Sequence, residues 1–156
     1  MHFILRSVRL LSLTTVAAAL AVSAHAVPEG GIPSSALIQP ADLAQLIQSN
    51  KADKPLLIQV GYHVLYAQAH ISGSEYIGPA TSDAAIAKLR KRLNPLPKNK
   101  LIVIYCGCCP WSHCPNLQPA YDALKAMGFT NLKVLYIADN LGTDWVDKGY
   151  PVEKGD

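Results

Sequence analysis

Apolar residues along this chain fall into two patterns, short unbroken runs and runs with helical spacing. The unbroken runs are rich in Leu, Ile and Val and lie at 55–60, 101–105 and 132–137. Such runs predict strands covered on both faces, as in parallel sheets, and 101–105 is expected at the centre. The segments around them predict helices at 41–47, 82–93 and 117–127. Alternating strands and helices favour an α/β domain with a mainly parallel central sheet flanked by helices.

Polar residues mark the expected starts of the helices. Ser82 or Asp83 can cap the second helix, and Asn116 can cap the third. Thr143 is expected to cap a last short helix. The ordered structure is then expected to end at 150–151.

All four cysteines lie within nine residues, directly after the predicted central strand. They are Cys106, Cys108, Cys109 and Cys114. In parallel sheets, ligands bind beyond the carboxyl ends of the strands, which is where Cys106 stands. The loop leads into a helix N-terminus, whose unpaired N–H groups and dipole lower the pKa of a nearby thiol. Gly107 allows a tight turn after the strand, and Cys106 is predicted to be a nucleophile.

The N-terminal segment 1–26 has the composition of a secretory signal peptide. Arg6 and Arg9 provide its positive region, 10–22 is apolar, and the small residues Ala24 and Ala26 suit cleavage after Ala26. The apolar run is too short to span a bilayer comfortably as a helix, and an uncleaved membrane anchor is the alternative. We therefore expect an exported, periplasmic protein with no stable membrane anchor after cleavage.

The remaining chain is long enough for one domain with one core. Residues 27–35 are expected to form a flexible leader and 36–156 to form the domain. Without Arg6 and Arg9 the net charge falls from +3 to +1, so no surface for nucleic acid is expected. Export permits disulfides, but stabilising disulfides close long loops. The clustered cysteines close only short loops, which favours a reactive or metal-binding cluster.

Four interpretations of the cysteine loop are open. Cys106 can form a persulfide, which the neighbouring thiols resolve or protect by forming a disulfide. The segment 109–114 resembles a thioredoxin-type dithiol motif lengthened by one residue, and a disulfide there needs α-carbons within about 7 Å. Four thiolates and His113 suit Zn²⁺ or Cu⁺, although adjacent Cys108 and Cys109 cannot easily face one tetrahedral centre. The last interpretation is a structural disulfide in a loop that only binds. Persulfide formation is favoured.

Five short segments match one known family in the same order along the chain. They are 57–60 (LIQV), 69–74 (AHISGS), 102–106 (IVIYC), 124–129 (LKAMGF) and 145–151 (WVDKGYP). Together they resemble rhodanese domains, which are single-cysteine sulfurtransferases, over about 36–152. The resemblance implies a rhodanese-like fold and sulfur transfer through a persulfide on Cys106.

The chain departs from the family pattern around the cysteine. Gln59 and Gly61 stand where the family has Asp and Arg, so the family's usual buried ion pair is absent. The loop after Cys106 is several residues longer than the family's cradle, which packs its amides around the sulfur. It contains no Arg or Lys to bind thiosulfate, and His113 is its one potentially cationic side chain.

The resemblance also bears on residues outside the nucleophile position. His70 is expected to serve structure rather than catalysis. Asp139, Asn140 and Asp144 are expected near the place where the family closes over its site, and the acidity of the two aspartates would repel an anionic sulfur donor. Trp111 in the loop can cover the pocket, contact a partner or pack onto the sheet edge.

These observations predict an exported rhodanese-like sulfurtransferase that moves sulfane sulfur through a Cys106 persulfide, held by backbone amides of the loop and helix start. Its expected partners are a small sulfur donor and a thiophilic acceptor, and no metal or other cofactor is expected. The loop residues expected to bind them are Gly107, Cys108, Cys109, Trp111, Ser112, His113 and Cys114. The alternative is a non-catalytic or redox module whose loop binds a thiophilic metal or cycles between dithiol and disulfide.

Overall fold

A computed structural model describes residues 31–49 and 53–155 of the chain. Its centre is a five-stranded sheet of order β1-β6-β5-β2-β4, in which each neighbouring pair of strands is parallel. The strands are β1 (Leu37–Ile38), β2 (Leu56–Gln59), β4 (Glu75–Tyr76), β5 (Ile102–Tyr105) and β6 (Leu132–Leu135). The mainly parallel sheet and the central place of β5 are confirmed.

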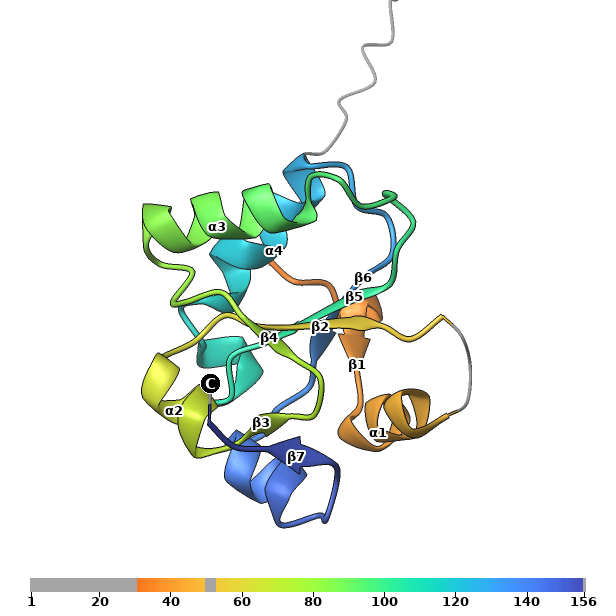
Figure 1. Ribbon diagram of the computed structural model, residues 1–156, viewed down its shortest axis with the longest axis vertical. Coiled ribbons are helices and arrows are strands. Elements are labelled where there is room, and N and C mark those ends of the chain that lie inside the picture. The colour runs from red at the N-terminus through yellow and green to blue at the C-terminus, as the bar shows by residue number, and fades with distance from the viewer. Residues whose placement is uncertain (1–30, 50–52, 156) are drawn as a thin grey trace, which may run out of the picture.

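Helices cover both faces of this sheet, as Figure 1 shows. On one face lie α3 (Asp83–Leu93) and α4 (Leu117–Ala126), and on the other lie α1 (Pro40–Gln48) and the π-helical turn η3 (Gly142–Val146). The shorter elements are η1 (Ser34–Ala36), α2 (His63–Gln68) and η2 (Trp111–His113). The three helices expected from apolar spacing are therefore present, with bounds close to those predicted.

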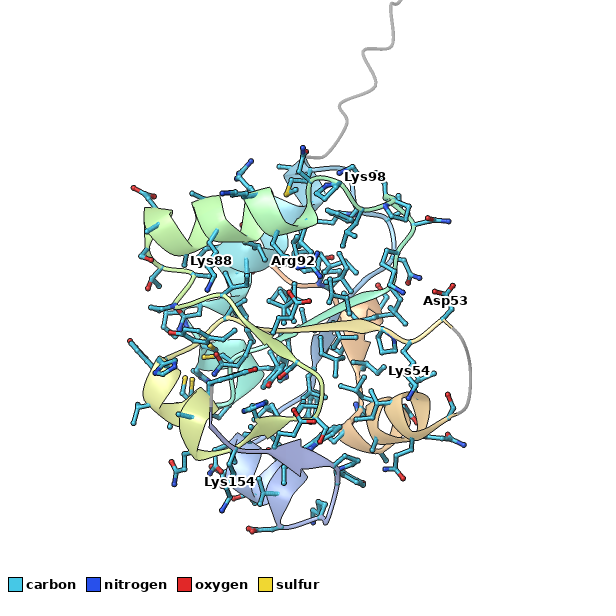
Figure 2. All side chains as sticks on the ribbon, viewed as in Figure 1. Asp53, Lys54, Lys88, Arg92, Lys98 and Lys154 are labelled. Atoms are coloured by element: carbon cyan, nitrogen blue, oxygen red, sulfur yellow. The ribbon has the colours of Figure 1, made fainter. Side chains whose placement is uncertain are left out.

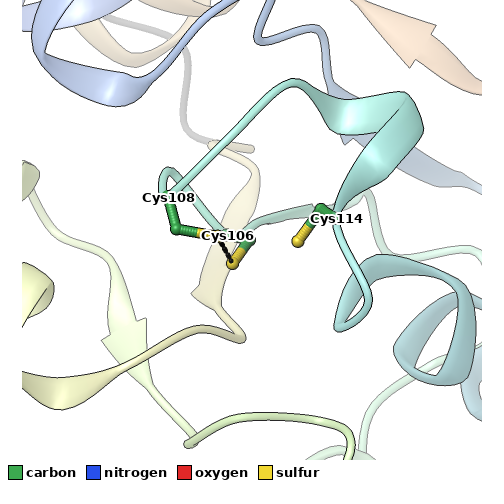
Figure 3. A group of neighbouring side chains, drawn as sticks. All are labelled: Cys106, Cys108 and Cys114. Carbon is green, nitrogen blue, oxygen red and sulfur yellow. Dashed lines mark hydrogen bonds between the residues drawn. The ribbon is translucent and has the colours of Figure 1, made fainter.

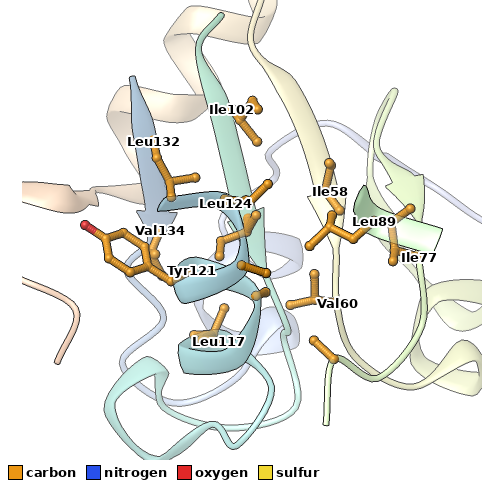
Figure 4. Packing of buried hydrophobic residues seen from close by; sticks show 14 of the residues in the cluster. Ile58, Val60, Ile77, Leu89, Ile102, Leu117, Tyr121, Leu124, Leu132 and Val134 are labelled. Atoms are coloured by element: carbon orange, nitrogen blue, oxygen red, sulfur yellow. The ribbon is translucent and has the colours of Figure 1, made fainter. Parts of the chain in front are cut away.

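The central strands divide their side chains between two buried clusters, as the alternation along a strand requires. The cluster under α3 and α4 includes Ile58, Val60, Leu89, Ile102, Ile104 and Leu124 (Figure 4). The cluster on the α1 face includes Leu43, Leu57, Val103, Tyr105, Leu135 and Trp145. Each fully buried aliphatic side chain contributes roughly 1.5–3 kcal/mol to folding. The end of β5 is thereby held between two packed layers, and the next residue, Cys106, belongs to the first cluster.

The helix caps differ from the sequence expectation at two of three places. Ser82 caps α3, because its Oγ accepts a hydrogen bond from Ala85 N at 3.2 Å. Asn116 makes no side-chain cap on α4, so that expectation is wrong. Thr143 does not cap η3 either, since Asn140 Oδ1 accepts from Thr143 N at 3.0 Å. Both asparagines lie beside the cysteine loop, where tertiary contacts decide their partners.

Regular structure does not end at 150–151, as was expected, but continues in a further strand. The strand β7 (Val152–Glu153) follows and pairs antiparallel with β3 (His70–Ile71), forming a second, two-stranded sheet. Trp145 Nε1 donates to Pro151 O at 2.9 Å, and Gly155 N donates to Ala67 O at 2.9 Å. The C-terminal segment is therefore fastened across the end of α2. The expectation failed because two-residue strands carry no periodic signal and are fixed by their partners.

The predicted signal peptide 1–26 and the leader residues 27–30 lie outside the described residues. In the following residues, Ala36 of η1 is buried, and Lys133 Nζ donates to Ser35 O at 2.7 Å. Within 31–49 and 53–155, every helix falls short of the length and apolar character that a membrane span requires.

Candidate active site

Cys106 follows the last residue of β5 at the carboxyl edge of the sheet. The chain turns at once, because Gly107 has a φ of +84°, which glycine adopts at little cost. Gly107 O accepts a hydrogen bond from Leu141 N at 3.0 Å, which ties the turn to the segment before η3. Cys106 itself is 1% exposed. The buried thiol of Cys106 therefore lies where the central strand ends and the loop begins, as the sequence pattern predicted.

The loop folds back so that three sulfur atoms surround one point. Sγ of Cys106, Cys108 and Cys114 all lie within 4.8 Å of one another (Figure 3). Cys106 Sγ and Cys108 Sγ are 3.2 Å apart, and Cys108 Sγ and Cys109 Sγ are 3.1 Å apart. All four cysteines are free thiols. The sulfur atoms joined in a disulfide would lie about 2.05 Å apart. The longer distances here are those of hydrogen bonds between thiols.

Asn116 contacts the Cys106 sulfur from the buried side of the site. Its side chain is fully buried, and its Nδ2 donates to Cys106 Sγ at 3.6 Å. Its Oδ1 accepts from Thr81 N at 3.2 Å and from Thr81 Oγ1 at 3.3 Å. Because Thr81 supplies two donors to the oxygen, the amide nitrogen is turned toward the sulfur. This contact replaces the helix cap that sequence reasoning assigned to Asn116.

The donors around Cys106 favour its ionised form. Hydrogen bonds lower the pKa of the Cys106 thiol to about 6, first from Cys114, then from the thiol and backbone N–H of Cys108 and from Asn116, while burial opposes them. Burial and the hydrogen bonds to Cys109 and Cys106 raise the pKa of Cys108 to about 12. The hydrogen bond to Cys106, together with burial, raises the pKa of Cys114. These shifts favour a thiolate on Cys106 at neutral pH, with Cys108 and Cys114 as neutral thiols beside it.

The expected cradle of backbone amides is only partly present. The Cys108 N–H donates to the Cys106 sulfur. Four further N–H groups of the loop and the helix start donate to carbonyl oxygens instead. These N–H groups belong to Trp111, His113, Cys114 and Leu117. The longer loop therefore replaces much of the amide cradle with thiol and carboxamide donors.

The end of β2 forms the wall opposite the loop. Gln59 Nε2 donates to Cys106 O at 3.0 Å, and Gln59 Oε1 accepts from Gly61 N at 3.2 Å. The glutamine thus takes the place of the family's ion pair with a neutral bridge. A Cβ on Gly61 would lie 2.8 Å from Cys106 Sγ and 2.9 Å from Cys106 O, so no larger residue fits there. The residues that depart from the family pattern are the ones that seat this sulfur.

A cavity of about 500 Å³ opens in front of Cys106. It is lined by Gln59, Leu65, Gln68, Ala69, Cys106, Gly107, Cys108, Asn140, Leu141, Gly142, Val146 and Lys154. The walls combine aliphatic side chains with neutral amides, which suits a small ligand with an apolar part and a few polar groups.

Lys154 is the one cationic side chain in the cavity lining, counted over the described residues (Figure 2). It follows β7, so the pairing of β7 with β3 brings it to the cavity. Asp139 and Asp144 lie outside the lining, because Asp144 Oδ2 accepts from Asp139 N and Asp139 Oδ2 accepts from Thr143 Oγ1. Of the three residues expected at the closing segment, only Asn140 lines the cavity. The expectation that Asp139 and Asp144 line the pocket is therefore wrong.

The remaining loop residues point elsewhere. Gly107 and Cys108 line the cavity, whereas Cys109, Ser112, His113 and Cys114 lie outside its lining. Trp111 packs against the core cluster under α4, and its ring centroid lies 6.4 Å from that of Tyr136. Trp111 therefore packs at the sheet edge, one of the three possibilities expected for it.

His70 is buried between α2 and β7, away from the cavity. Its Nδ1 donates to Tyr66 O at 2.8 Å, and its Nε2 lies 3.6 Å from Glu153 Oε2. Its ring stacks on Tyr66 with centroids 3.7 Å apart. These contacts fasten α2 and β7 to β3, so the structural role expected for His70 fits its position.

Sequence reasoning missed the cavity-lining residues of α2 and η3 and two polar residues of the site, Asn116 and Lys154. Asn116 was assigned to a helix end, where asparagine is common, and nothing in the local sequence indicates a partner ten residues back. Lys154 lies beyond the expected end of the order. A signal for Lys154 was available only in Val152, an apolar residue after Pro151 that can extend an edge strand.

Solved structures with the same fold exist in bacteria. The rhodanese-like domain of the Alr3790 protein from Anabaena sp, determined in solution, is 20% identical, with a TM-score of 0.54 over 76% of this chain and 79% of that one. The BH2092 protein from Bacillus halodurans is 22% identical, with a TM-score of 0.59 over 77% of each chain. At these identities the similarity shows the fold.

A further similar structure is the enzyme EanB with a persulfide on its cysteine, in a tetrahedral intermediate state with ergothioneine. It is 20% identical, with a TM-score of 0.56 over 75% of this chain and 27% of that one. None of the curated proteins matches the sequence. The profile of the rhodanese-like domain, however, matches residues 39–137, which is more than half of the chain. This chain therefore belongs to the rhodanese-like domain family.

Proposed function

We propose that this protein is an exported sulfurtransferase that carries sulfane sulfur on Cys106. The observation that carries the proposal is the position of Cys106: a buried sulfur at the carboxyl end of the central strand, facing a cavity and surrounded by hydrogen-bond donors. A thiolate in such surroundings is available as a nucleophile at neutral pH. The persulfide in EanB supports this chemistry on the same fold.

The first half-reaction loads the sulfur. The Cys106 thiolate attacks the outer sulfur of a donor, a new S–S bond forms, and the bond between that sulfur and the rest of the donor breaks. The donor fragment leaves with the bonding electron pair. The Cys108 thiol and N–H and the Asn116 amide remain beside the inner sulfur, where they stabilise the thiolate before attack and again when the sulfur is unloaded.

The second half-reaction unloads the sulfur. A thiophilic acceptor attacks the outer sulfur of the persulfide, and Cys106 leaves as the thiolate from which it started. Because its surroundings lower the pKa of Cys106, it is a good leaving group as well as a nucleophile. The acceptor reaches the sulfur through the cavity, since Cys106 is otherwise enclosed.

The cavity supports a small anionic donor such as thiosulfate. Lys154 supplies a positive charge at the lining, and the two carboxylates nearest the closing segment are engaged in local hydrogen bonds outside it. Leu65, Leu141 and Val146 supply the apolar part of the walls. A charged sulfur oxyanion therefore meets one cation and several neutral amide donors.

Cys106→Ala tests the proposal. The reduced protein is incubated with thiosulfate and, in a parallel run, with tetrasulfide, and persulfide is followed by intact mass and by labelling. At the earliest time points wild type gains one sulfur atom and Cys106→Ala gains none, while the single variants Cys108→Ala, Cys109→Ala and Cys114→Ala keep some labelling. Labelling of Cys106→Ala at the wild-type level contradicts the assignment of the nucleophile.

A second candidate function is the binding of a thiophilic metal, favoured by the mutual distances of three sulfur atoms within 4.8 Å. Three thiolates converging on one point suit Cu⁺ or Zn²⁺. The measurement is the metal content of protein purified under reducing conditions and titrated with each ion. Stoichiometric binding that is lost in Cys114→Ala favours this function, and an ion-free protein with full persulfide formation excludes it.

Export is proposed from the sequence of 1–26. The expected mature chain begins at Val27. N-terminal sequencing of protein recovered from the periplasm and from the culture medium checks both the cleavage site and the compartment. A mature chain that retains residues 1–26 in the membrane fraction supports the uncleaved anchor instead.

A further inference from the structure

The sulfur atoms of the loop are arranged asymmetrically around Cys106, and this gives the persulfide a second fate. We propose that Cys108 is a resolving thiol: it attacks the Cys106 persulfide, releases the outer sulfur as sulfide and leaves a disulfide between Cys106 and Cys108. The inference rests on the proposed function, because it needs the persulfide, and it adds an internal reductive step.

The distance between the two sulfur atoms supports this step. Cys108 Sγ lies 3.2 Å from the Cys106 sulfur that it attacks, so bond formation needs an approach of about 1.1 Å. Gly107 separates the two cysteines and has a φ of +84°, which folds one cysteine back toward the other (Figure 3). The reacting atoms are thus already in contact before any donor arrives.

Cys108 and Cys114 differ in their access to the cavity. Cys108 lines the cavity beside Cys106, so sulfide released there leaves through the same opening by which the donor enters. Cys114 is 7% exposed, belongs to the core cluster and lies outside the cavity lining. Its sulfur lies within 4.8 Å of Cys106 Sγ and lowers the pKa of the Cys106 thiol. The structure therefore gives Cys114 the role of a donor and Cys108 the position for attack.

Cys109 is one step further out. Its sulfur lies 3.1 Å from Cys108 Sγ. The hydrogen bond between these two thiols holds the Cys108 side chain in place. Cys109 is thus arranged behind Cys108, on the side away from Cys106.

The step balances in atoms and electrons. The bond between Cys106 Sγ and the outer sulfur breaks, and a bond between Cys106 Sγ and Cys108 Sγ forms. The outer sulfur leaves with the bonding pair and takes up the thiol proton of Cys108, so the anionic persulfide releases it as hydrosulfide, HS⁻. The sulfane sulfur is reduced by two electrons, and the two cysteine sulfurs are oxidised to a disulfide. A second turnover needs an external dithiol reductant, which opens the disulfide by thiol–disulfide exchange.

The test is a single turnover of the reduced, full-length chain with thiosulfate, in the absence of other thiols. Sulfite and sulfide are quantified, and the protein is examined by intact mass and peptide mapping. Wild type is expected to release one sulfite and one sulfide per chain and to lose two hydrogen atoms in a Cys106–Cys108 disulfide. Cys108→Ser is expected to release one sulfite and no sulfide and to retain one added sulfur atom. Added dithiol reduces the wild-type disulfide, so that a further addition of thiosulfate releases sulfide again.

Other results overturn the inference. Sulfide release by Cys108→Ser at the wild-type level, or a disulfide that joins Cys106 to Cys114 or Cys109, assigns the step to another thiol. The matched variant Cys109→Ser distinguishes the two adjacent thiols, because accumulation of persulfide in Cys109→Ser alone makes Cys109 the resolving residue. A wild type that keeps the added sulfur and releases no sulfide refutes the inference but upholds the proposed function. A wild type that forms neither sulfite nor adduct refutes both.

Discussion

The two ends of the cysteine loop both carry cysteines, but the surroundings of these cysteines differ. At the first end, Cys106 and Cys108 face the cavity. At the second end, Cys114 and Asn116 lie in the packed interior and direct their polar atoms at the Cys106 sulfur. The first end is placed to react with small molecules, and the second end is placed to hold the charge of the reacting sulfur.

The difference follows from burial and from the number of donors. A thiolate under a packed helix would be costly without partners, because burial disfavours the charged form. Cys114 and Asn116 supply donors from the buried side, so Cys106 is ionised where an isolated buried thiol would be neutral. Thiols in one short loop therefore take unlike roles because the fold gives each a different set of neighbours. Four substitutions test this division, from the largest expected effect to the smallest.

Gly61→Ala disturbs the cavity end most strongly. The added Cβ would lie within 3 Å of both Sγ and O of Cys106, and the backbone there cannot move freely because Gly61 N is bonded to Gln59. We expect a stability loss of roughly 1–3 kcal/mol from overpacking. Persulfide formation should fall roughly 100-fold, since misplacing a reacting atom by about 1 Å has that effect. Thermal unfolding and single-turnover kinetics measure the two effects. A variant with wild-type kinetics contradicts the seating of Cys106 by Gly61.

Cys114→Ala removes the largest of the donors that lower the pKa of Cys106. In wild type, alkylation of Cys106 should be half-maximal near pH 6 and level above it. In the variant the midpoint should move up toward the ordinary thiol value of about 8.5, which lowers the rate at pH 6 by roughly ten-fold or more. Iodoacetamide labelling of the Cys106 peptide across pH 5–10 gives both profiles.

The same pKa has a stability consequence with a defined sign. Since folding lowers the pKa of Cys106 to about 6, its contribution to stability is present above the unfolded pKa and is lost as the pH falls through about 6. Cys114→Ala should flatten this dependence, while Cys114→Ser, which keeps a donor, should resemble wild type more closely. If stability depends on pH in the same way in Cys114→Ala and in wild type, Cys114 does not stabilise the Cys106 thiolate.

Lys154→Gln tests the cavity end by charge alone. A partly exposed charge interacting with an anion is worth about 1 kcal/mol, so KM for thiosulfate should rise about five-fold with little change in kcat. Lys154→Arg should retain most of the affinity. Wild-type affinity for thiosulfate should also fall with added salt, more than that of the glutamine variant. Steady-state kinetics at two salt concentrations measure this, and equal KM values for Lys154→Gln and wild type exclude Lys154 from donor binding.

Thr81→Val has the smallest expected effect and addresses the buried end indirectly. It removes the hydroxyl that donates to Asn116 Oδ1 but keeps the backbone N–H that donates to the same atom. The loss of one hydrogen bond of this kind costs about 1 kcal/mol. The alkylation midpoint of Cys106 should rise slightly, and denaturant unfolding should show the stability loss. An unchanged midpoint together with a full stability loss would limit Thr81 to a structural role.

The local sequence carried much of the fold. Unbroken apolar runs identified the central strands, and their alternation with helices predicted the parallel sheet, because these signals depend on neighbouring residues. The placement of Cys106 followed from the same pattern, since a residue directly after a parallel strand stands at its carboxyl edge. The expectations that failed, at Asn116, Thr143 and 150–151, concern residues whose partners lie elsewhere in the chain.

The sequence by itself determined the sheet, the position of Cys106 and the gathering of cysteines in one loop. Only the tertiary structure decided which cysteine faces the cavity and which supports the thiolate, because nine residues of loop can fold in many ways and packing under α4 selects one. It also decided that Asn116 turns to the sulfur and that Lys154 reaches the cavity, through Thr81 and through the pairing of β7 with β3. Hydrogen-bond donors and charges act through space, so their effect on one thiol depends on distances that chain order does not contain.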